Sequence, residues 1–182
     1  MAQGWVALLR AVNLGARNKV PMARLREVLE ELGCESVATY IQSGNVVFVR
    51  GRASDRQRLT KELERAIEAE FGVASRVVLR TFAEIEKLAA AHHPFGDDTS
   101  QTHVAFLAAK PTGKAVRALE ALDIDPDRFE LRGSDVFMHY PNGVQGSRLA
   151  SRLEKTLDVP GTVRTWKTVT RLAEMAKNAR AG

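Results

Sequence analysis

The first residues of the chain with a chemistry to offer are Arg10, Asn13 and Asn18. They stand at the end of the apolar run 5–12, which reads as a buried strand, and in the loop that leads to a helix. Strand ends and helix N-termini expose backbone N–H groups and favour anions, so a phosphate or carboxylate site is one interpretation. The loop has neither of the glycine patterns typical of nucleotide-binding loops. Hydrogen bonding of both asparagines within their own loop is therefore the favoured interpretation.

A second polar group is the segment Gln42-Ser43-Gly44-Asn45 between two apolar runs. Glycine and asparagine tolerate positive φ, so turn formation alone explains the segment. Gln42 is the exception, because it is a long amide at the end of an otherwise apolar strand. Pointing into a cleft beside Tyr40, it would read the polar edge of a ligand.

His139 is the histidine best placed for acid–base chemistry, and the neighbouring Tyr140 would orient a substrate. A single histidine on a strand is more often structural, and no Ser/His/Asp arrangement accompanies it. The lone Cys34 reads as a small buried residue without an activating base. His92 and His93 are adjacent and would point about 100° apart on a helix, so no metal site is expected, and no cofactor either.

The elements that must position these side chains occur twice. Residues 80–89 (RTFAEIEKLA) return as residues 164–173 (RTWKTVTRLA), and residues 5–9 are echoed by 103–107. A repeated pattern indicates one supersecondary unit used twice, with a seam where a shared cleft can form.

Periodicity gives each half the order β-α-β-β-α-β followed by one more helix. In the first half the strands are expected over residues 5–12, 37–42, 46–50 and 75–80. Its helices begin at Pro21, at a capping box of Ser54 and Gln57, and at a capping box of Thr81 and Glu84. In the second half the strands are expected over residues 103–108, 129–132, 135–140 and 162–165, and the helices over 114–122, 148–157 and 166–177.

This order predicts an α+β protein made of two ferredoxin-like subdomains in tandem, each with an antiparallel sheet. The domains are expected at residues 1–95 and 96–182, joined through the Pro- and Gly-containing segment 92–98. Helices cover one face of such a sheet, so a partner half would cover the other.

The positive charge is concentrated near the C-terminus. The net charge is +5, yet residues 1–147 hold 19 basic and 19 acidic residues, so the excess lies in residues 148–182. A basic C-terminal face would attract phosphates or nucleic acid without reading its sequence. A solvated helix surface explains the same charge and is favoured.

Composition is that of an ordinary globular protein, with 45% hydrophobic and 27% charged residues. No apolar run approaches the ~20 residues of a membrane helix, and no basic leader precedes the first strand. A cytoplasmic protein is expected, and its oligomeric state is left open.

Several blocks in chain order resemble one bacterial family, the domain of unknown function 1697. They are residues 8–15 (LLRAVNLG), 18–22 (NKVPM), 40–48 (YIQSGNVVF), 139–143 (HYPNG) with Ser147, and 164–166 (RTW). The resemblance implies the same pair of ferredoxin-like subdomains and brings no established activity. Ala11 and Ala16 stand where glycines are expected from the family pattern, which puts a close backbone approach in that loop in doubt.

The leading functional hypothesis is the binding of a small anionic or nucleotide-like ligand in the cleft between the halves. The residues expected to line it are Arg10, Asn13, Asn18, Gln42, Asn45, His139, Tyr140, Arg164 and Trp166. Two alternatives stay open: nucleic-acid binding through the basic C-terminal face, and a hydrolase or transferase that uses His139.

Overall fold

A computed structural model describes residues 2–51, 55–96 and 98–181 of the chain. The chain divides into two compact units, one of residues Met1–Ala90 with Thr170–Gly182 and one of residues Ala91–Val169. Whether the sequence halves 1–95 and 96–182 fold as separate domains stays a prediction.

The first unit is a four-stranded antiparallel sheet in the order β2-β3-β1-β4. Its elements are β1 (Gln3–Leu9), α1 (Met22–Glu31), β2 (Cys34–Tyr40), β3 (Asn45–Arg50), α2 (Arg56–Phe71), β4 (Val77–Thr81) and α3 (Phe82–Ala90). The second unit repeats this plan with the sheet order β6-β7-β5-β8. Its elements are β5 (Thr102–Leu107), α4 (Gly113–Glu120), β6 (Arg128–Arg132), β7 (Asp135–His139), α5 (Arg148–Leu157), β8 (Gly161–Thr165) and the start of α6 (Trp166–Ala181). The predicted fold class is thereby confirmed.

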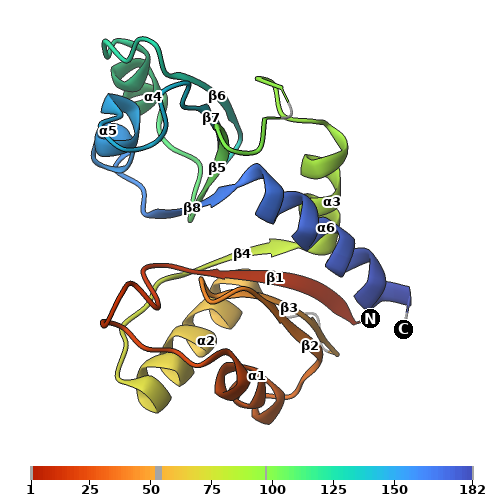
Figure 1. Cartoon of the computed structure of the whole chain (residues 1–182). Helices are drawn as coiled ribbons and strands as arrows, with labels where there is room; N and C mark the ends of the chain where they lie inside the picture. Colours follow the sequence, from red (N-terminus) through yellow and green to blue (C-terminus); the bar gives the residue numbers. More distant parts are fainter. Residues whose placement is uncertain (1, 52–54, 97, 182) are drawn as a thin grey trace. The chain divides into compact units, whose positions relative to one another are not determined.

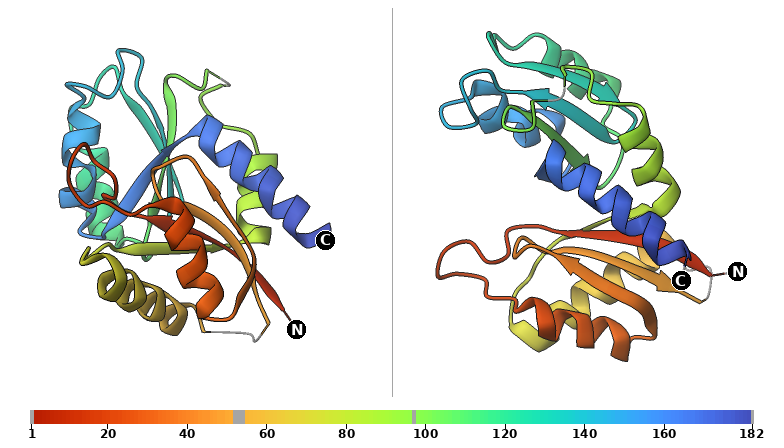
Figure 2. Two further views of the ribbon diagram at one scale, coloured as in Figure 1. Left: turned by 60° about the horizontal axis from the view of Figure 1, so that its bottom comes forward. Right: turned by 45° about the vertical axis from the view of Figure 1, so that its right-hand side comes forward.

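Both faces of β1, a central strand of the first sheet, are buried. Trp5, Ala7 and Leu9 of β1 face the core beneath α1 and α2, while Val6 and Leu8 on the opposite face are also fully buried. Figures 1 and 2 show α1 and α2 together on one face of this sheet. Burial on both faces explains why β1 is a continuous apolar run instead of an alternating one.

On the other face of the first sheet, α3 begins directly after β4 and packs closely on β1. A Cβ atom added at Gly4 would lie 2.1 Å from the Phe82 ring, so only glycine leaves room for that ring. The end of α6 lies beside α3, where Arg180 forms an ion pair with Glu86 at 3.3 Å.

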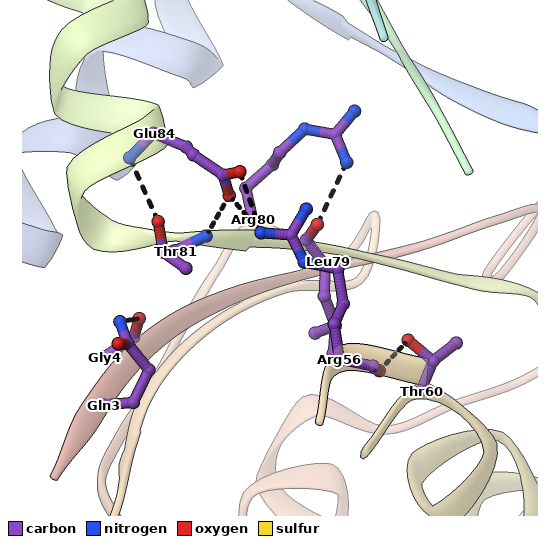
Figure 3. Close-up of polar contacts among 8 residues, drawn as sticks. All are labelled: Gln3, Gly4, Arg56, Thr60, Leu79, Arg80, Thr81 and Glu84. Atoms are coloured by element: carbon purple, nitrogen blue, oxygen red, sulfur yellow. Dashed lines mark hydrogen bonds and ion pairs between the residues drawn. The ribbon is translucent and has the colours of Figure 1, made fainter. Parts of the chain in front are cut away.

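The predicted capping box at the start of α3 is present (Figure 3). The backbone N–H of Glu84 donates to Thr81 Oγ1 at 3.2 Å, and the backbone N–H of Thr81 donates to Glu84 Oε2 at 2.7 Å. Arg56, the first residue of α2, donates to both carboxylate oxygens of Glu84 at 2.8 and 2.7 Å. Burial alone would raise the pKa of Glu84, but the hydrogen bonds from Arg56 and from the Thr81 N–H lower it overall.

We expect Glu84→Ala to lower the free energy of unfolding by about 1 to 2 kcal/mol, because it removes the acceptor of the Thr81 N–H and a half-exposed ion pair. Glu84→Gln keeps an acceptor for the Thr81 N–H and should recover roughly half of the loss. Urea unfolding of the two variants measures the difference. Equal losses in both would mean that the ion pair, and not the cap, carries the effect.

Several element bounds and caps differ from the sequence predictions, and three of them are instructive. β2 begins at Cys34 instead of Val37, because a bulge with Ser36 at φ 51° lets the strand start earlier. α2 is capped by Asp55, whose side chain accepts from Arg58 N, whereas the predicted Ser54 lies outside the described residues. α6 continues to Ala181, beyond the predicted end at Lys177. In the described part of the chain, no helix is both long enough and apolar enough to cross a membrane.

Candidate anion-binding pocket

The asparagines of the β1–α1 loop hold their own loop together. Asn13 donates from Nδ2 to the carbonyls of Val20 at 2.9 Å and Gln42 at 2.7 Å, and its Oδ1 accepts from the Val20 N–H at 2.8 Å. Asn18 donates to the carbonyl of Ala11 at 2.8 Å. Both asparagines have positive φ, near 50°. These contacts agree with the interpretation that both asparagines structure their own loop.

The β2–β3 turn lies against the same loop. Gln42 is in the turn and exposed, not in the strand, because Ile41 adopts φ 50° directly after β2. Asn45 is fully buried and donates to the carbonyl of Tyr40 at 3.0 Å. The structure thus brings Asn13, Gln42 and Asn45 to one end of the first sheet. Arg10 lies near this end too, where its backbone N–H donates to the carbonyl of Arg76 at 2.9 Å.

His139, in the second unit, has polar partners at both ring nitrogens. Nε2 lies 3.1 Å from Gln101 Oε1, and Nδ1 lies 3.4 Å from a guanidinium nitrogen of Arg128. A donating Arg128 makes Nδ1 the acceptor, which leaves the proton on Nε2 to be donated to Gln101. Both ring nitrogens are therefore engaged within the protein.

Three further residues expected at the site are buried in the second unit. Tyr140 is 1% exposed, its hydroxyl donates to Met138 Sδ at 2.9 Å, and burial together with Asp127 raises the pKa of the phenol. Trp166 packs edge-on against His93, with ring centroids 5.2 Å apart. Burial lowers the pKa of Arg164 to about 10.

The basic residues of the C-terminal segment 148–182 are divided between the two units. Within the described residues, Arg148 forms an ion pair with Asp123, Arg171 with Glu174 and Arg180 with Glu86. Since Arg164 is buried as well, half of the eight bases are already engaged or enclosed. Nucleic-acid binding by this segment stays a prediction.

A large pocket lies in the first unit, on the helix-covered side of the sheet. It has a volume of about 1360 Å³ and is lined by the end of α1, the start of β2, the end of β3 and residues 57–66 of α2. Four of its lining residues are basic and three are acidic: Arg50, Arg58, Lys61 and Arg65, and Glu35, Asp55 and Glu62. We call it the α2 pocket.

Arg50 is neutralised on the pocket floor. Its Nη2 donates to Glu62 Oε1 at 2.9 Å, and its Nη1 lies 3.9 Å from the sulfur of the buried Cys34. Burial opposes the charge of Arg50, but the Glu62 carboxylate prevails and raises the pKa of the guanidinium. Burial raises the pKa of the Cys34 thiol, and this effect exceeds the opposite effect of the nearby Arg50 charge. The Cys34 sulfur is therefore not an activated nucleophile.

The remaining cations form a row along α2. Arg58, Lys61 and Arg65 are spaced by three and four residues, which places them on one face of the helix. All three are exposed, and their side chains form no ion pair with any residue that the structure describes. The Asp55 carboxylate is engaged by the Arg58 N–H at 3.0 Å. The pocket wall formed by α2 therefore carries three positive charges that have no ionic partner among the described residues.

Metal binding has no support in the described segments, where no group of three or more His, Cys, Asp or Glu side chains is arranged to hold an ion.

Residues 2–137 match a family described as "Protein of unknown function (DUF1697)". This match spans well over half of the chain. The chain belongs to the DUF1697 family. The family predicted from the sequence blocks is thereby confirmed, and the whole α2 pocket lies within the matched residues.

A solved structure supports the same fold for this DUF1697 protein. The conserved bacterial protein SP0830 from Streptococcus pneumoniae matches it with a TM-score of 0.75 at 20% sequence identity. The match covers 97% of this chain and 99% of that chain, and at this identity it carries the fold alone. No curated protein matches the chain.

None of the α2-pocket residues was among the predicted site residues of this DUF1697 protein. A signal was nevertheless present, because residues 50–65 hold six basic residues against three acidic ones. The charges of residues 1–147 cancel as a whole, so their sum does not show this local excess of positive charge. Only the fold shows that some of these basic residues face a concavity.

Proposed function

We propose that the first unit binds a small anionic ligand, phosphorylated or nucleotide-like, in the α2 pocket. The observation that carries the proposal is the row of Arg58, Lys61 and Arg65 on one pocket wall without ionic partners among the described residues. The predicted ligand site at the seam of the two halves involves residues of both units and stays a prediction.

Electrostatics favours an anion on this wall of the α2 pocket. Three like charges on one helix face repel one another, and a bound anion relieves that repulsion. Arg58 lies in the first turn of α2, where the helix dipole adds positive potential. Because the wall borders a concavity, the field there is less screened than on a convex surface.

The lining of the α2 pocket suits binding better than catalysis. No histidine is among its lining residues, Glu62 is held by Arg50, and the nearby Cys34 thiol is buried with a raised pKa. General acid–base and nucleophilic chemistry most often use a histidine or an activated cysteine, and neither is among the described lining residues.

The test is a thermal-shift and calorimetric screen of inorganic phosphate, sugar phosphates and nucleotides. A ligand at 100 times its Kd should stabilise the protein by about 2.7 kcal/mol. In the triple variant Arg58→Gln, Lys61→Gln, Arg65→Gln, affinity should fall by about 10- to 100-fold, because each exposed charge contributes up to about 1 kcal/mol.

A matched control removes the same charge elsewhere. The variant Lys114→Gln, Arg152→Gln, Lys177→Gln also lowers the net charge by three, at exposed positions outside the α2 pocket. It should bind as the unmodified protein does. Equal weakening in both triple variants would reduce the effect to net charge, and the absence of any phosphorylated ligand would contradict the proposal.

A further inference from the structure

We infer that the ligand of the α2 pocket is a nucleoside di- or triphosphate, with its phosphate chain along α2 and its uncharged end toward the junction of α1 and β2. This inference rests on the proposed function and names the class of ligand.

The length of the cationic row calls for more than one phosphate. At a rise of 1.5 Å per residue, Arg58 and Arg65 are separated by about 10.5 Å along the helix axis, with Lys61 between them. A single phosphate contacts the cations at both ends of this row only where their long side chains converge on it. A chain of two or three phosphates spans several of them and gains a charge-assisted hydrogen bond from each.

The end of α1 contributes uncharged residues to the α2 pocket. Leu32 and Gly33, at the end of α1, line it, and the space where a Cβ of Gly33 would stand is empty within 4 Å. A half-buried leucine beside open backbone offers a surface on which a flat, largely apolar ring can lie. The volume of about 1360 Å³ leaves room for such a ring in addition to the phosphates.

Glu35 gives this end of the pocket a negative charge. It is exposed at the start of β2, lines the pocket and has no ionic partner among the described residues. A carboxylate repels a continuous polyanion but accepts hydrogen bonds from hydroxyl or amino groups. The pocket thus matches a ligand that is anionic at one end and carries uncharged donors at the other, as a nucleotide does.

A single-stranded nucleic acid fits this lining less well. Strand-binding grooves stack bases on aromatic side chains, and none of the described residues that line the α2 pocket is aromatic. The negative charge of Glu35 would also lie in the path of a continuing phosphate backbone.

The experiment is isothermal titration of the full chain with AMP, ADP and ATP, with ribose 5-phosphate and tripolyphosphate as part-ligands. Affinity should rise about fivefold or more with each added phosphate, as expected for one more contact with an exposed cation. ATP should bind more tightly than tripolyphosphate, because the nucleoside adds contacts at the Leu32 end. In Arg58→Gln, Arg65→Gln, which removes both ends of the row, AMP and ATP should bind about equally.

Glu35→Gln provides a second, independent readout. It should strengthen tripolyphosphate binding and leave ATP binding unchanged or weaker, so the preference for ATP shrinks. Equal affinities for AMP and ATP would overturn this inference while leaving a phosphate-binding pocket in place. Tighter binding of tripolyphosphate or of a short oligonucleotide than of ATP would overturn the nucleoside assignment. Failure of all phosphorylated probes would overturn the proposed function itself.

Discussion

Asn13→Ala should lower the free energy of unfolding of the first unit by about 3 to 4 kcal/mol. The substitution removes three hydrogen bonds, each worth about 1 kcal/mol, and places alanine at a φ of 53°, which costs about 1 kcal/mol more. The measurement is urea unfolding followed by fluorescence in a Trp166→Phe background, which leaves Trp5 of the first unit as the only tryptophan.

Two companion variants separate the contributions. Asn13→Gly loses the hydrogen bonds but tolerates positive φ, so it should be about 1 kcal/mol more stable than Asn13→Ala. Asn18→Ala loses a single, exposed hydrogen bond and should cost about 1 to 2 kcal/mol. If Asn13→Ala were no more damaging than Asn18→Ala, the joint between the β1–α1 loop and the β2–β3 turn would not be the structural role of Asn13.

The β2–β3 turn shows how far sequence reasoning reaches. Gly44 at φ 76° was expected as a turn residue, and the hairpin is there. The tight packing of Gly44 could not be predicted from the sequence, because its close neighbours Leu9 and Val12 are far away along the chain. A Cβ atom on Gly44 would lie 2.6 Å from Leu9 Cβ and 2.8 Å from Val12 Cγ2. Local residue types predict the turn, but only the tertiary structure shows which side chains pack against it.

The bounds of α5 and β2 illustrate the same distinction between local signals and tertiary structure. α5 was predicted at its observed bounds, Arg148–Leu157, because a serine cap and leucines in line are local signals. β2 was predicted to begin three residues late, because Glu35 and Ser36 interrupt the apolar run. Pairing with β3 across a bulge overrides that interruption, and no local pattern encodes the pairing.

The α2 pocket depends on a similar non-local fact. The spacing of Arg58, Lys61 and Arg65 predicts a basic stripe on an amphipathic helix. Such a stripe is usually interpreted as a solvated face. The stripe lines a concavity because the end of α1, the start of β2 and the end of β3 lie beside residues 57–66 of α2. Only the fold distinguishes a solvated stripe from the wall of a pocket.

Two buried histidines should make the second unit acid-sensitive. His93 is 4% exposed, and its pKa is lowered chiefly by burial, with the positive charge of Arg132 adding to the effect. His103 is 9% exposed, its pKa is lowered by burial, and its Nδ1 has no hydrogen-bond partner among the described residues. Both side chains are therefore held in the neutral form.

The geometry around His93 explains the preference for the neutral ring. Nε2 lies 3.1 Å from the carbonyl of His103, and the backbone N–H of Phe95 donates to Nδ1 at 3.3 Å. A proton on Nδ1 would face another N–H instead of an acceptor. The ring also packs edge-on against Phe137 and Trp166, which cannot solvate a charge.

The sign of the pH dependence follows from the lowered pKa values. Near an ordinary histidine pKa of about 6.5, the unfolded chain binds more protons than the folded one, so stability rises with pH. The contribution is complete above that value and is lost as the pH falls from it through the folded-state pKa of each ring. We expect the slope to reach up to about 1.4 kcal/mol per pH unit for each histidine, and twice that where both titrate together.

Denaturant unfolding between pH 7.5 and 5, in a Trp5→Phe background that leaves Trp166 as the probe, measures this slope. Carboxylates with a lowered pKa, such as Glu84 and Asp98, act below this window, because an ordinary carboxyl pKa is already near 4. His93→Gln keeps a donor and an acceptor but loses the ring contacts, so it should be less stable at pH 7.5 and show a flatter profile. If stability depended on pH as steeply in His93→Gln as in the unmodified protein, His93 would be excluded as a source of the acid sensitivity. The matching His103→Gln variant tests the other ring in the same way.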